Sequence, residues 1–380
     1  MPTPRYVVIA NPAGKRWQAY APELEAFWAE RGVRPEVEVV PWYEVVPRDG
    51  DLDGLPAFDR PALVRLESPG RDWDVTKLLL QAGEREDGGD GARWAALPYE
   101  KGRLVRPGLL YRGFRRVLRG LRRSFDRRPR LTALACPLAV AELFDKNATA
   151  ARLEASGVPC PPSLPAPDTP DALLALLREQ RFHPAYVKLN TGSSASGIAV
   201  VHAGGDEPWA VSSVLRLRGG FFSTRLLRRH SGDDLRAVLG FLLDEGACVQ
   251  RGVRMAQIDG HNFDVRVVVI HGRPAFTVFR LSPQPMTNLH LGGRRGDPAR
   301  CRAAVPTRAW LDGLDHCVEA AALYRCAAVG VDLLFESGYL RHYVLEVNAF
   351  GDFFPGLVDE RGVSVHGAEV EATARAHGLL

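Results

Sequence analysis

The stretch AYVKLNTGSSASGIAVV (Ala185–Val201) is the most informative segment of the chain. Two short apolar runs flank a loop of Thr, Gly, Ser and Ala, which predicts two strands joined as a hairpin. A loop of small residues exposes backbone N–H groups that can cover phosphates, and Lys188 at its base can neutralise their charge. Only five of the 49 Lys and Arg residues are lysines, which hints at a role for Lys188 that arginine does not fill. A plain hairpin with a flexible tip is the alternative.

Composition indicates a globular protein without a membrane-spanning segment. The chain has 380 residues, of which 46% are hydrophobic and 25% charged, enough for two or three domains. No apolar run approaches the roughly 20 residues of a spanning helix, and the short run near the N-terminus does not have the pattern of a secretory signal. The six cysteines are scattered without a C-x-x-C pair, which favours reduced thiols. We expect a cytoplasmic protein with no membrane partner.

The net charge of +4 is unevenly distributed, because nine arginines lie within residues 112–130. Apolar residues recur beneath them at helical spacing, which predicts one amphipathic helix. The arginines form either a solvated helix face or a landing surface for an acidic substrate or nucleic acid. No nucleic-acid-binding module accompanies the helix, so we expect no nucleic-acid partner and leave its role open.

The first part of the chain reads as an α/β domain. The turn after the first strand, NPAGKR, is not a phosphate-binding Walker A loop, because Ile9 and Arg16 occupy positions that need Gly and Ser or Thr. No G-x-G-x-x-G dinucleotide fingerprint follows a strand either. The alternating strands and helix predict a parallel sheet, and residues 83–93 a polar, Gly-rich loop. The expected strands are 5–10, 37–40 and 62–66, and the expected helix is 23–31.

A short helix is well delimited between Asp145, a good N-cap, and Gly157, a good residue to end it. Lys146 falls in its first turn, where a cation opposes the helix dipole at a cost of roughly 0.3–1 kcal/mol. That cost weakly favours a reason for Lys146 beyond helix formation. A solvated lysine is the alternative.

The C-terminal part predicts carboxylates and arginines on paired strands. An antiparallel pair that turns at HGRP carries Asp264, Arg266 and Arg280, and a helix expected over 312–328 leads to two further strands, GVDLLF and YVLEVN. Glu346 and Asn348 are two residues apart and share one side of a strand. Together with Asp332 on the neighbouring strand they offer hard oxygen ligands that suit Mg²⁺ rather than zinc. A solvated polar strand face is the alternative. The histidines show no metal-ligand spacing, although His290 lies in a loop that could touch substrate.

These motifs together resemble the ATP-grasp superfamily, especially glutathione synthetase and the RimK-type amino-acid ligases. The ordered matches are DKNAT with GVP, VKLNTGSSASGI, VQRGV, FDVRV, FR with TNLHLGG, GVDLL and LEVN, which run from Asp145 to Asn348. The resemblance implies an α/β and α+β protein: two α+β lobes that close on ATP, preceded by a Rossmann-like domain. It places the N-terminal domain at 1–135, the small lid subdomain at 136–249 and the C-terminal subdomain with the metal and catalytic residues at 250–380.

The resemblance also implies how ATP is held. Lys146 and Lys188 would contact the phosphates, the lid backbone would close over them, and the hinge VQRGV would bind adenine. Arg251 stands where family members often have an acidic residue, and Gln257 would be a ribose contact. The implied ATP-binding residues are Lys146, Lys188, Thr191, Gly192, Ser193, Ser194, Gly197, Gln250, Arg251, Val253 and Gln257.

The implied reaction joins a carboxylate to an amine through an acyl phosphate, with release of ADP and phosphate. Arg266 and Arg280 would lie at the γ-phosphate and the reacting carbonyl, and Asn288 would help Arg280 to stabilise the tetrahedral oxyanion. Two Mg²⁺ ions, which Mn²⁺ could replace, offset the charge of the transferring phosphoryl group. The implied metal ligands are Asp332, Glu346 and Asn348.

Three questions stay open from the sequence. The loop AFGDFFPGL after Asn348 is bulkier than the Ser-Pro-Gly turn of RimK-type ligases, and the Arg-rich segment 203–245 is longer than a lid needs. The loop suggests an acceptor other than an ordinary amino acid, and the Arg-rich segment could clamp an acidic or peptidic substrate or simply pack on the lid. We expect small-molecule or peptide substrates, and a homodimer is left open. A small-molecule kinase on the same fold and a non-catalytic ATP-binding regulatory protein are the alternative functions.

Overall fold

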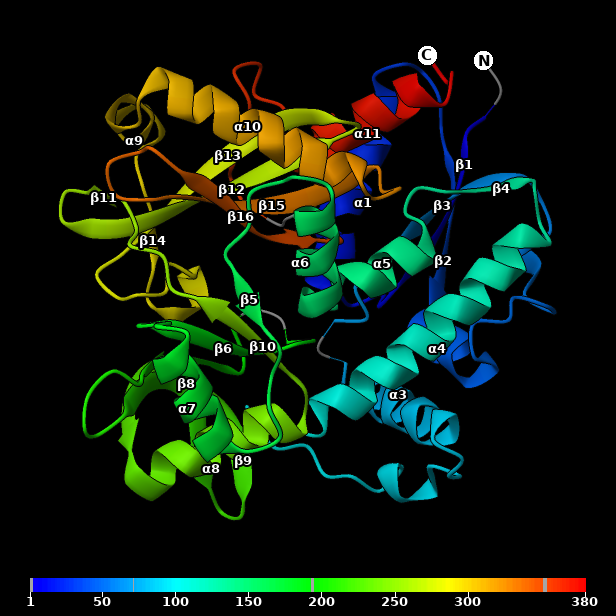
Figure 1. Ribbon diagram of the computed structural model, residues 1–380. Coiled ribbons are helices and arrows are strands. Elements are labelled where there is room, and N and C mark those ends of the chain that lie inside the picture. The colour runs from blue at the N-terminus through cyan, green and yellow to red at the C-terminus, as the bar shows by residue number, and fades with distance from the viewer. Residues whose placement is uncertain (1–2, 71, 193–194, 351–353) are drawn as a thin grey trace.

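The computed structural model describes residues 3–70, 72–192, 195–350 and 354–380, which form three sheets with helices packed on them (Figure 1). The first sheet is parallel and the other two are mainly antiparallel. This confirms the predicted α/β and α+β fold class. In the described residues no helix is both long and apolar enough to cross a membrane.

The N-terminal sheet has four parallel strands in the order β2-β1-β3-β4. Alternate residues of its strands enter two different cores, because successive side chains point to opposite faces. Val7 and Ile9 join the large core under α3 and α4, whereas Tyr6 packs with α1 and the C-terminal helix α11. The strands are β1 (Arg5–Ala10), β2 (Glu36–Pro41), β3 (Ala62–Leu66) and β4 (Leu131–Ala133). The helices of this part are α1 (Lys15–Ala29), α2 (Trp42–Val45), α3 (Trp73–Glu86) and α4 (Pro107–Asp126), with 3₁₀ turns at Val46–Arg48, Pro56–Phe58 and Ala92–Trp94.

The Arg-rich helix is α4, and most of its cationic face is neutralised within the chain. Six of the nine arginines make ion pairs with carboxylates of α3, of the segment 49–53 or of the helix itself. The pairs are Arg112–Asp87, Arg116–Asp49, Arg116–Glu86, Arg119–Glu86, Arg122–Asp126, Arg127–Asp51 and Arg128–Asp53. The face therefore fixes α4 on its own domain and is not a free basic surface.

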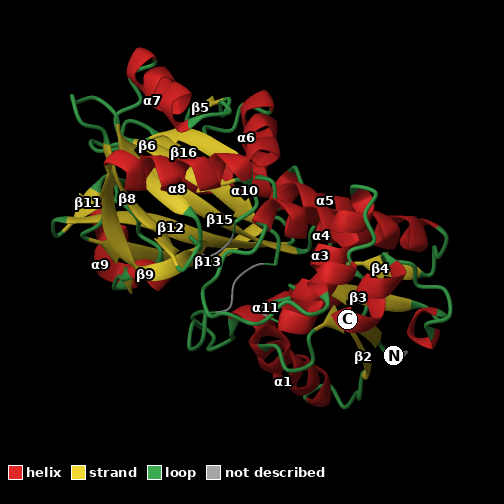
Figure 2. Ribbon diagram, turned by 90° about the horizontal axis from the view of Figure 1, so that it is seen from below, coloured by secondary structure: helices red, strands yellow, loops and turns green. Residues whose placement is uncertain are grey.

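The first of the two antiparallel sheets has the order β5-β10-β6-β7-β8-β9. It belongs to a lobe with its own apolar core, residues 163–251, which we call the lid lobe. Helices α7 and α8 supply the apolar side chains that pack on this sheet (Figure 2). The predicted hairpin is present as β6 and β7. The strands are β5 (Ser163–Leu164), β6 (Ala185–Leu189), β7 (Ile198–His202), β8 (Trp209–Leu217), β9 (Gly220–Ser231) and β10 (Ala247–Arg251). The helices are α7 (Pro170–Glu179) and α8 (Gly232–Asp244), and α5 (Pro137–Leu143) and α6 (Lys146–Ala155) lead into the lobe.

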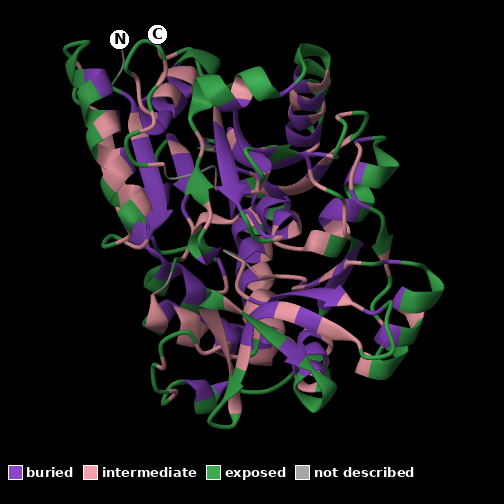
Figure 3. Cartoon of the chain, turned by 90° about the vertical axis from the view of Figure 1, so that its left-hand side faces the viewer, coloured by how far each residue is buried: buried purple, intermediate pink, exposed green. Residues whose placement is uncertain are grey.

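The second antiparallel sheet has the order β14-β13-β12-β15-β16, and α10 packs against its buried face. Residues of this sheet and of the N-terminal sheet share one apolar core. Figure 3 shows buried residues along the central strands and exposed residues on the outer helix faces, the loops and some edge strands. Helix α11 returns to the N-terminal domain and packs against α1. The strands are β11 (Gln257–Ile258), β12 (His261–Ile270), β13 (Arg273–Ser282), β14 (Arg294–Arg295), β15 (Ala328–Phe335) and β16 (His342–Asn348). The helices are α9 (Pro298–Ala304), α10 (Thr307–Ala322) and α11 (Val365–Ala376), with a 3₁₀ turn η4 at Leu289–Leu291.

Several predicted boundaries were wrong. Residues 83–93 are not all loop, because α3 continues to Glu86, and α1 begins at Lys15, earlier than the predicted 23. The helix expected over 312–328 is α10, which ends at Ala322, and Ala328 already belongs to β15. The segment 203–245 folds as β8, β9 and α8 and extends the lid sheet to its edge.

Candidate active site

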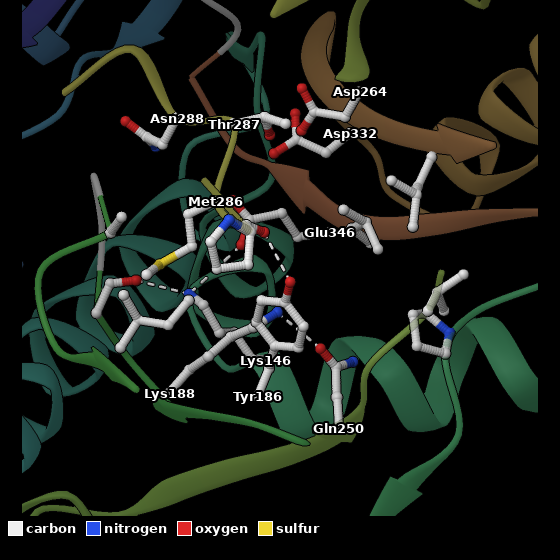
Figure 4. Close-up of a pocket in the computed structure, with 18 of the residues that line it drawn as sticks. Lys146, Tyr186, Lys188, Gln250, Asp264, Met286, Thr287, Asn288, Asp332 and Glu346 are labelled. Atoms are coloured by element: carbon white, nitrogen blue, oxygen red, sulfur yellow. Dashed lines mark hydrogen bonds and ion pairs between the residues drawn. The ribbon is translucent and has the colours of Figure 1, made fainter. Parts of the chain in front are cut away.

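A cavity of about 950 Å³, its open mouth included, lies between the lid sheet and the second antiparallel sheet. Side chains of β6 and β10 line it from the lid, and side chains of β12, β13, β15 and β16 line it from the other lobe. Figure 4 shows Tyr186 and Lys188 entering from the lid side, with Asp264 and Asp332 across the cavity from them.

Lysines 188 and 146 bring positive charge to the lid side. Lys188 on β6 is half-buried, and its Nζ donates to Gln250 Oε1 at 2.7 Å. No ion pair joins Lys188 to a carboxylate within the described ranges, and burial lowers its pKa. Lys146, in the first turn of α6, donates to the Gly192 carbonyl at 2.6 Å and lies 3.7 Å from Glu346. Lys188 is a half-buried cation whose polar partner is an amide rather than a carboxylate, so an anion at this wall of the cavity would compensate its charge.

The opposite wall is a buried network of arginines and aspartates on one sheet face. Strand register places Asp264 opposite Arg280 and Arg266 opposite Asp332. Arg266 binds both oxygens of Asp332, and Arg280 contacts Asp332 at 3.0 Å. Burial alone would raise the pKa of Asp332, but Arg266 and Arg280 outweigh it and hold the pKa at about 2. Asp332 therefore stays ionised at neutral pH.

The predicted metal ligands lie next to one another on β15 and β16. Asp332 is opposite Glu346 and Gly330 is opposite Asn348, whose Nδ2 donates to the Gly330 carbonyl at 3.3 Å. Asp332 and Glu346 line the cavity. The described residues hold no cluster of three or more His, Cys, Asp or Glu suited to a metal ion. Nucleotide sites hold Mg²⁺ with one or two carboxylates plus phosphate oxygens, so two carboxylates at the cavity wall fit Mg²⁺ bound together with a nucleotide.

The loop between β13 and β14 forms one end of the cavity and carries Asn288. The side chain of Asn288 caps the η4 turn, where its Oδ1 accepts from the His290 N–H at 2.8 Å. That bond fixes the amide, so its Nδ2 group remains available as a donor. Thr287, the preceding residue, also lines the cavity and lies beside Asp264 and Asp332 (Figure 4).

The structure brings most of the predicted site residues to this cavity. Those that line it are Lys146, Lys188, Gly192, Gly197, Gln250, Arg251, Val253, Arg280, Asn288, Asp332 and Glu346. Arg266, Asn348 and Thr191 do not line it, although Arg266 is one step behind its wall through Asp332. Gln257 is exposed and donates to Asn262, away from the cavity. Ser193 and Ser194 lie outside the described residues.

Sequence analysis missed other residues of the cavity wall. Asp264 is predicted on a strand without a role, although it holds Arg280 through two hydrogen bonds. Tyr186, Met286 and Thr287 line the cavity as well. Of these residues, only Asp264 could have been predicted as part of the site from the sequence, because it stands two residues before Arg266 on the same strand face.

Comparisons with known proteins agree on the fold. Neither a protein-family model nor a curated protein matches this sequence. Among solved structures, D-cycloserine synthetase DcsG is 16% identical with a TM-score of 0.52, and the match covers 99% of this chain and 100% of that one. D-alanine–D-alanine ligase from Bacillus anthracis, in complex with ATP, is 11% identical with a TM-score of 0.51, covering 100% and 99%. The ADP complex of PurK, an N5-carboxyaminoimidazole ribonucleotide synthetase, is 11% identical with a TM-score of 0.54, covering 98% and 77%.

These identities are too low to carry over a substrate, but the matches extend along the whole chain. In this chain a parallel N-terminal sheet is followed by two antiparallel sheets, which enclose a cavity lined by two lysines and three carboxylates. By its fold, this chain is similar to D-cycloserine synthetase DcsG, D-alanine–D-alanine ligase and PurK.

Proposed function

We propose that this protein is an ATP- and Mg²⁺-dependent ligase that joins a carboxylate to an amine and releases ADP and phosphate. The observation that carries the proposal is Lys188, a half-buried cation with an amide as its polar partner, which faces two carboxylates across the cavity. Phosphate groups of a nucleotide would compensate Lys188, and a divalent cation between phosphates and Glu346 would compensate the carboxylates. The similar structures of a synthetase and of a ligase with bound ATP support the proposal.

In the proposed first step, a carboxylate oxygen of the substrate attacks the γ-phosphorus of ATP, and ADP leaves. Lys146 and Lys188 bind the phosphates, and the lid residues around Gly192 and Gly197 exclude water. Glu346 and Asp332, with Asn348 beside them, would hold Mg²⁺, which would supply positive charge to offset that of the transferring group.

In the proposed second step, the amine attacks the carbonyl carbon of the acyl phosphate and phosphate leaves. Negative charge develops on the carbonyl oxygen, where Arg280 and the Nδ2 group of Asn288 donate hydrogen bonds. Fixed donors of this kind contribute about 3–4 kcal/mol each. The chemistry needs no covalent enzyme nucleophile. Arg266 acts from behind the wall by holding Asp332.

Thermal unfolding with and without Mg-ATP tests the nucleotide site. ATP at 100 times its dissociation constant stabilises the folded state by about 2.7 kcal/mol. We expect a higher melting temperature with Mg-ATP, a much smaller rise in Lys188→Ala, and an unchanged rise in the control Lys101→Ala, which removes an exposed lysine that does not line the cavity. No rise in the wild type would refute ATP binding.

A screen of carboxylate and amine pairs for ADP release then tests the reaction. Mass spectrometry of the product separates the proposed ligase from a kinase, because a ligase yields an amide and free phosphate. A stable phosphorylated product would refute the ligase.

A further inference from the structure

The loop that carries Asn288 belongs covalently to one lobe but is packed against the other. It connects β13 to β14, yet Met286 and Leu291 are only 5% and 7% exposed and pack in one apolar cluster with Ile198 and Val200 of the lid strand β7. Loop and lid are therefore in direct apolar contact.

Tyr186 makes the polar link between the same two parts. Its hydroxyl donates to the Pro285 carbonyl at 2.6 Å, and Figure 4 shows the ring standing beside Lys188 in the cavity. Tyr186 and Lys188 are two residues apart on β6 and share one face of the strand. The strand that brings Lys188 to the cavity thus also holds the start of the Asn288 loop.

The other lobe holds the loop through the chain itself, because the loop continues from β13 into β14. The two attachments differ in kind. The strands that bound the loop belong to one sheet, so this attachment persists whatever the lid does. The Tyr186 link exists only while the lid lobe lies against the loop.

We propose that Tyr186 is a positioning residue, whose hydroxyl places Asn288 at the reacting carbonyl when the lid closes over ATP. The inference rests on the proposed ligase function. Closure would then complete the oxyanion site and shut out water in one movement, so that the acyl phosphate meets the amine and not water. Loss of the hydroxyl should uncouple ATP consumption from amide formation.

Tyr186→Phe removes this hydroxyl and keeps the ring. The matched control is Tyr111→Phe, since the Tyr111 hydroxyl donates to the Ala141 carbonyl at 2.9 Å, outside the cavity. Each variant loses one tyrosine-to-carbonyl hydrogen bond. A general loss of stability would affect both, and a positioning role affects Tyr186→Phe alone.

The first measurement needs neither the carboxylate nor the amine substrate. It is the rate of amide hydrogen exchange of residues 286–293 in the Mg²⁺ complex with a non-hydrolysable ATP analogue. Because a typical hydrogen bond contributes about 1 kcal/mol, we expect exchange about fivefold faster in Tyr186→Phe, with the β12 and β13 amides unchanged. Unchanged exchange in residues 286–293, or equal acceleration in Tyr111→Phe, would overturn the proposal.

The second measurement is the number of ATP molecules consumed per amide formed. We expect this ratio to rise in Tyr186→Phe and kcat to fall about five- to tenfold, with the KM for ATP unchanged. A fall in kcat with an unchanged ratio of ATP consumed to amide formed would show that Tyr186 is only a structural link, and would overturn the proposal. Absence of ADP formation by the wild type with every pair would refute the ligase function instead, and the exchange result would still decide whether Tyr186 positions the loop.

Discussion

Asp264 and Arg280 face each other across β12 and β13 and form a two-pronged ion pair. The Nε of Arg280 donates to Asp264 Oδ1 at 2.7 Å and its Nη2 donates to Oδ2. Both side chains are buried, and Thr287, the residue before Asn288, lies beside Asp264 at the cavity wall (Figure 4). The carboxylate of Asp264 therefore orients Arg280, one of the two donors that we assign to the oxyanion.

Asp264→Asn should impair chemistry far more than ATP binding. An asparagine presents a donor where Arg280 needs an acceptor. The guanidinium therefore loses one of its two hydrogen bonds to residue 264, and with it its fixed orientation. We expect kcat to fall at least about 100-fold, as when an oxyanion donor is lost, while the stabilisation by Mg-ATP in thermal unfolding persists. The control Asp171→Asn weakens the exposed Asp171–Arg236 pair and should leave kcat unchanged. Near-normal kcat in Asp264→Asn would show that Arg280 does not depend on it.

Glu346→Ala should abolish turnover and leave the fold intact. The Glu346 side chain is 29% exposed and has Lys146 at 3.7 Å as its ion-pair partner, so its removal costs little stability. It is also the more accessible of the two cavity carboxylates proposed to hold Mg²⁺ with ATP. We expect the Mg²⁺-dependent part of the ATP-induced rise in melting temperature to disappear, measured against an exposed control, Glu154→Ala. Full activity of Glu346→Ala would refute the metal assignment.

The fold was predictable wherever local signals agree. Strands β1 and β3 match their predicted ranges, and Asp145 and Gly157 delimit α6, because apolar runs and capping residues are properties of a few consecutive residues. Strand β9 was not predicted as a strand, because its arginines and aromatic residues show no clear alternation. It forms a strand because it pairs with β8.

Some residues of the site were predictable from the sequence and others were not. Charged residues in recognisable motifs, such as Lys188 and Glu346, were predicted from sequence and line the cavity. Tyr186 was not, because its partner Pro285 is 99 residues away and the contact exists only between two lobes. Such a relation has no signal in either segment alone.

The buried pair of Arg65 on β3 and Glu369 on α11 predicts acid sensitivity of the contact between the N-terminal domain and the last helix. Arg65 Nη1 and Nη2 donate to both oxygens of Glu369. Burial would raise the pKa of Glu369, but Arg65 and His366 outweigh it and hold the pKa at about 2, against an ordinary value of 4.5. A carboxyl with a lowered pKa stabilises the folded state above its unfolded pKa and loses that contribution as the pH falls towards the folded pKa.

The free energy of unfolding should therefore fall between about pH 4.5 and about pH 2. The share of Glu369 is on the order of 3 kcal/mol. Urea titrations at neutral and acid pH measure it as the difference between wild type and Glu369→Gln, which removes the titration. Glu360→Gln, at an exposed site on the neighbouring loop, is the control and should keep the pH dependence of the wild type. Identical pH dependence in Glu369→Gln would contradict the prediction.

The close approach of α3 and α4 at Gly83 and Gly113 gives a prediction in which packing and helix propensity disagree. Helix propensity alone says that Gly113→Ala, inside α4, stabilises the protein by about 0.8–1 kcal/mol. A Cβ on Gly113, however, would collide with the Leu79 carbonyl oxygen and lie 2.8 Å from the Gly83 nitrogen, and these backbone atoms cannot move aside unless the helices separate.

We expect the collision of the added Cβ with the backbone of α3 to outweigh the gain in helix propensity. Gly113→Ala should lower the free energy of unfolding by about 1–3 kcal/mol, the usual cost of overpacking, and separation of the helices would also strain the ion pairs from Arg112 and Arg119 to α3 and the residue after it. Urea unfolding measures the effect. Gly205→Ala is the control, since a Cβ there meets no atom within 4 Å and should leave stability nearly unchanged. If Gly113→Ala raised the stability instead, propensity would govern α4 and the helices could not lie as close together as described.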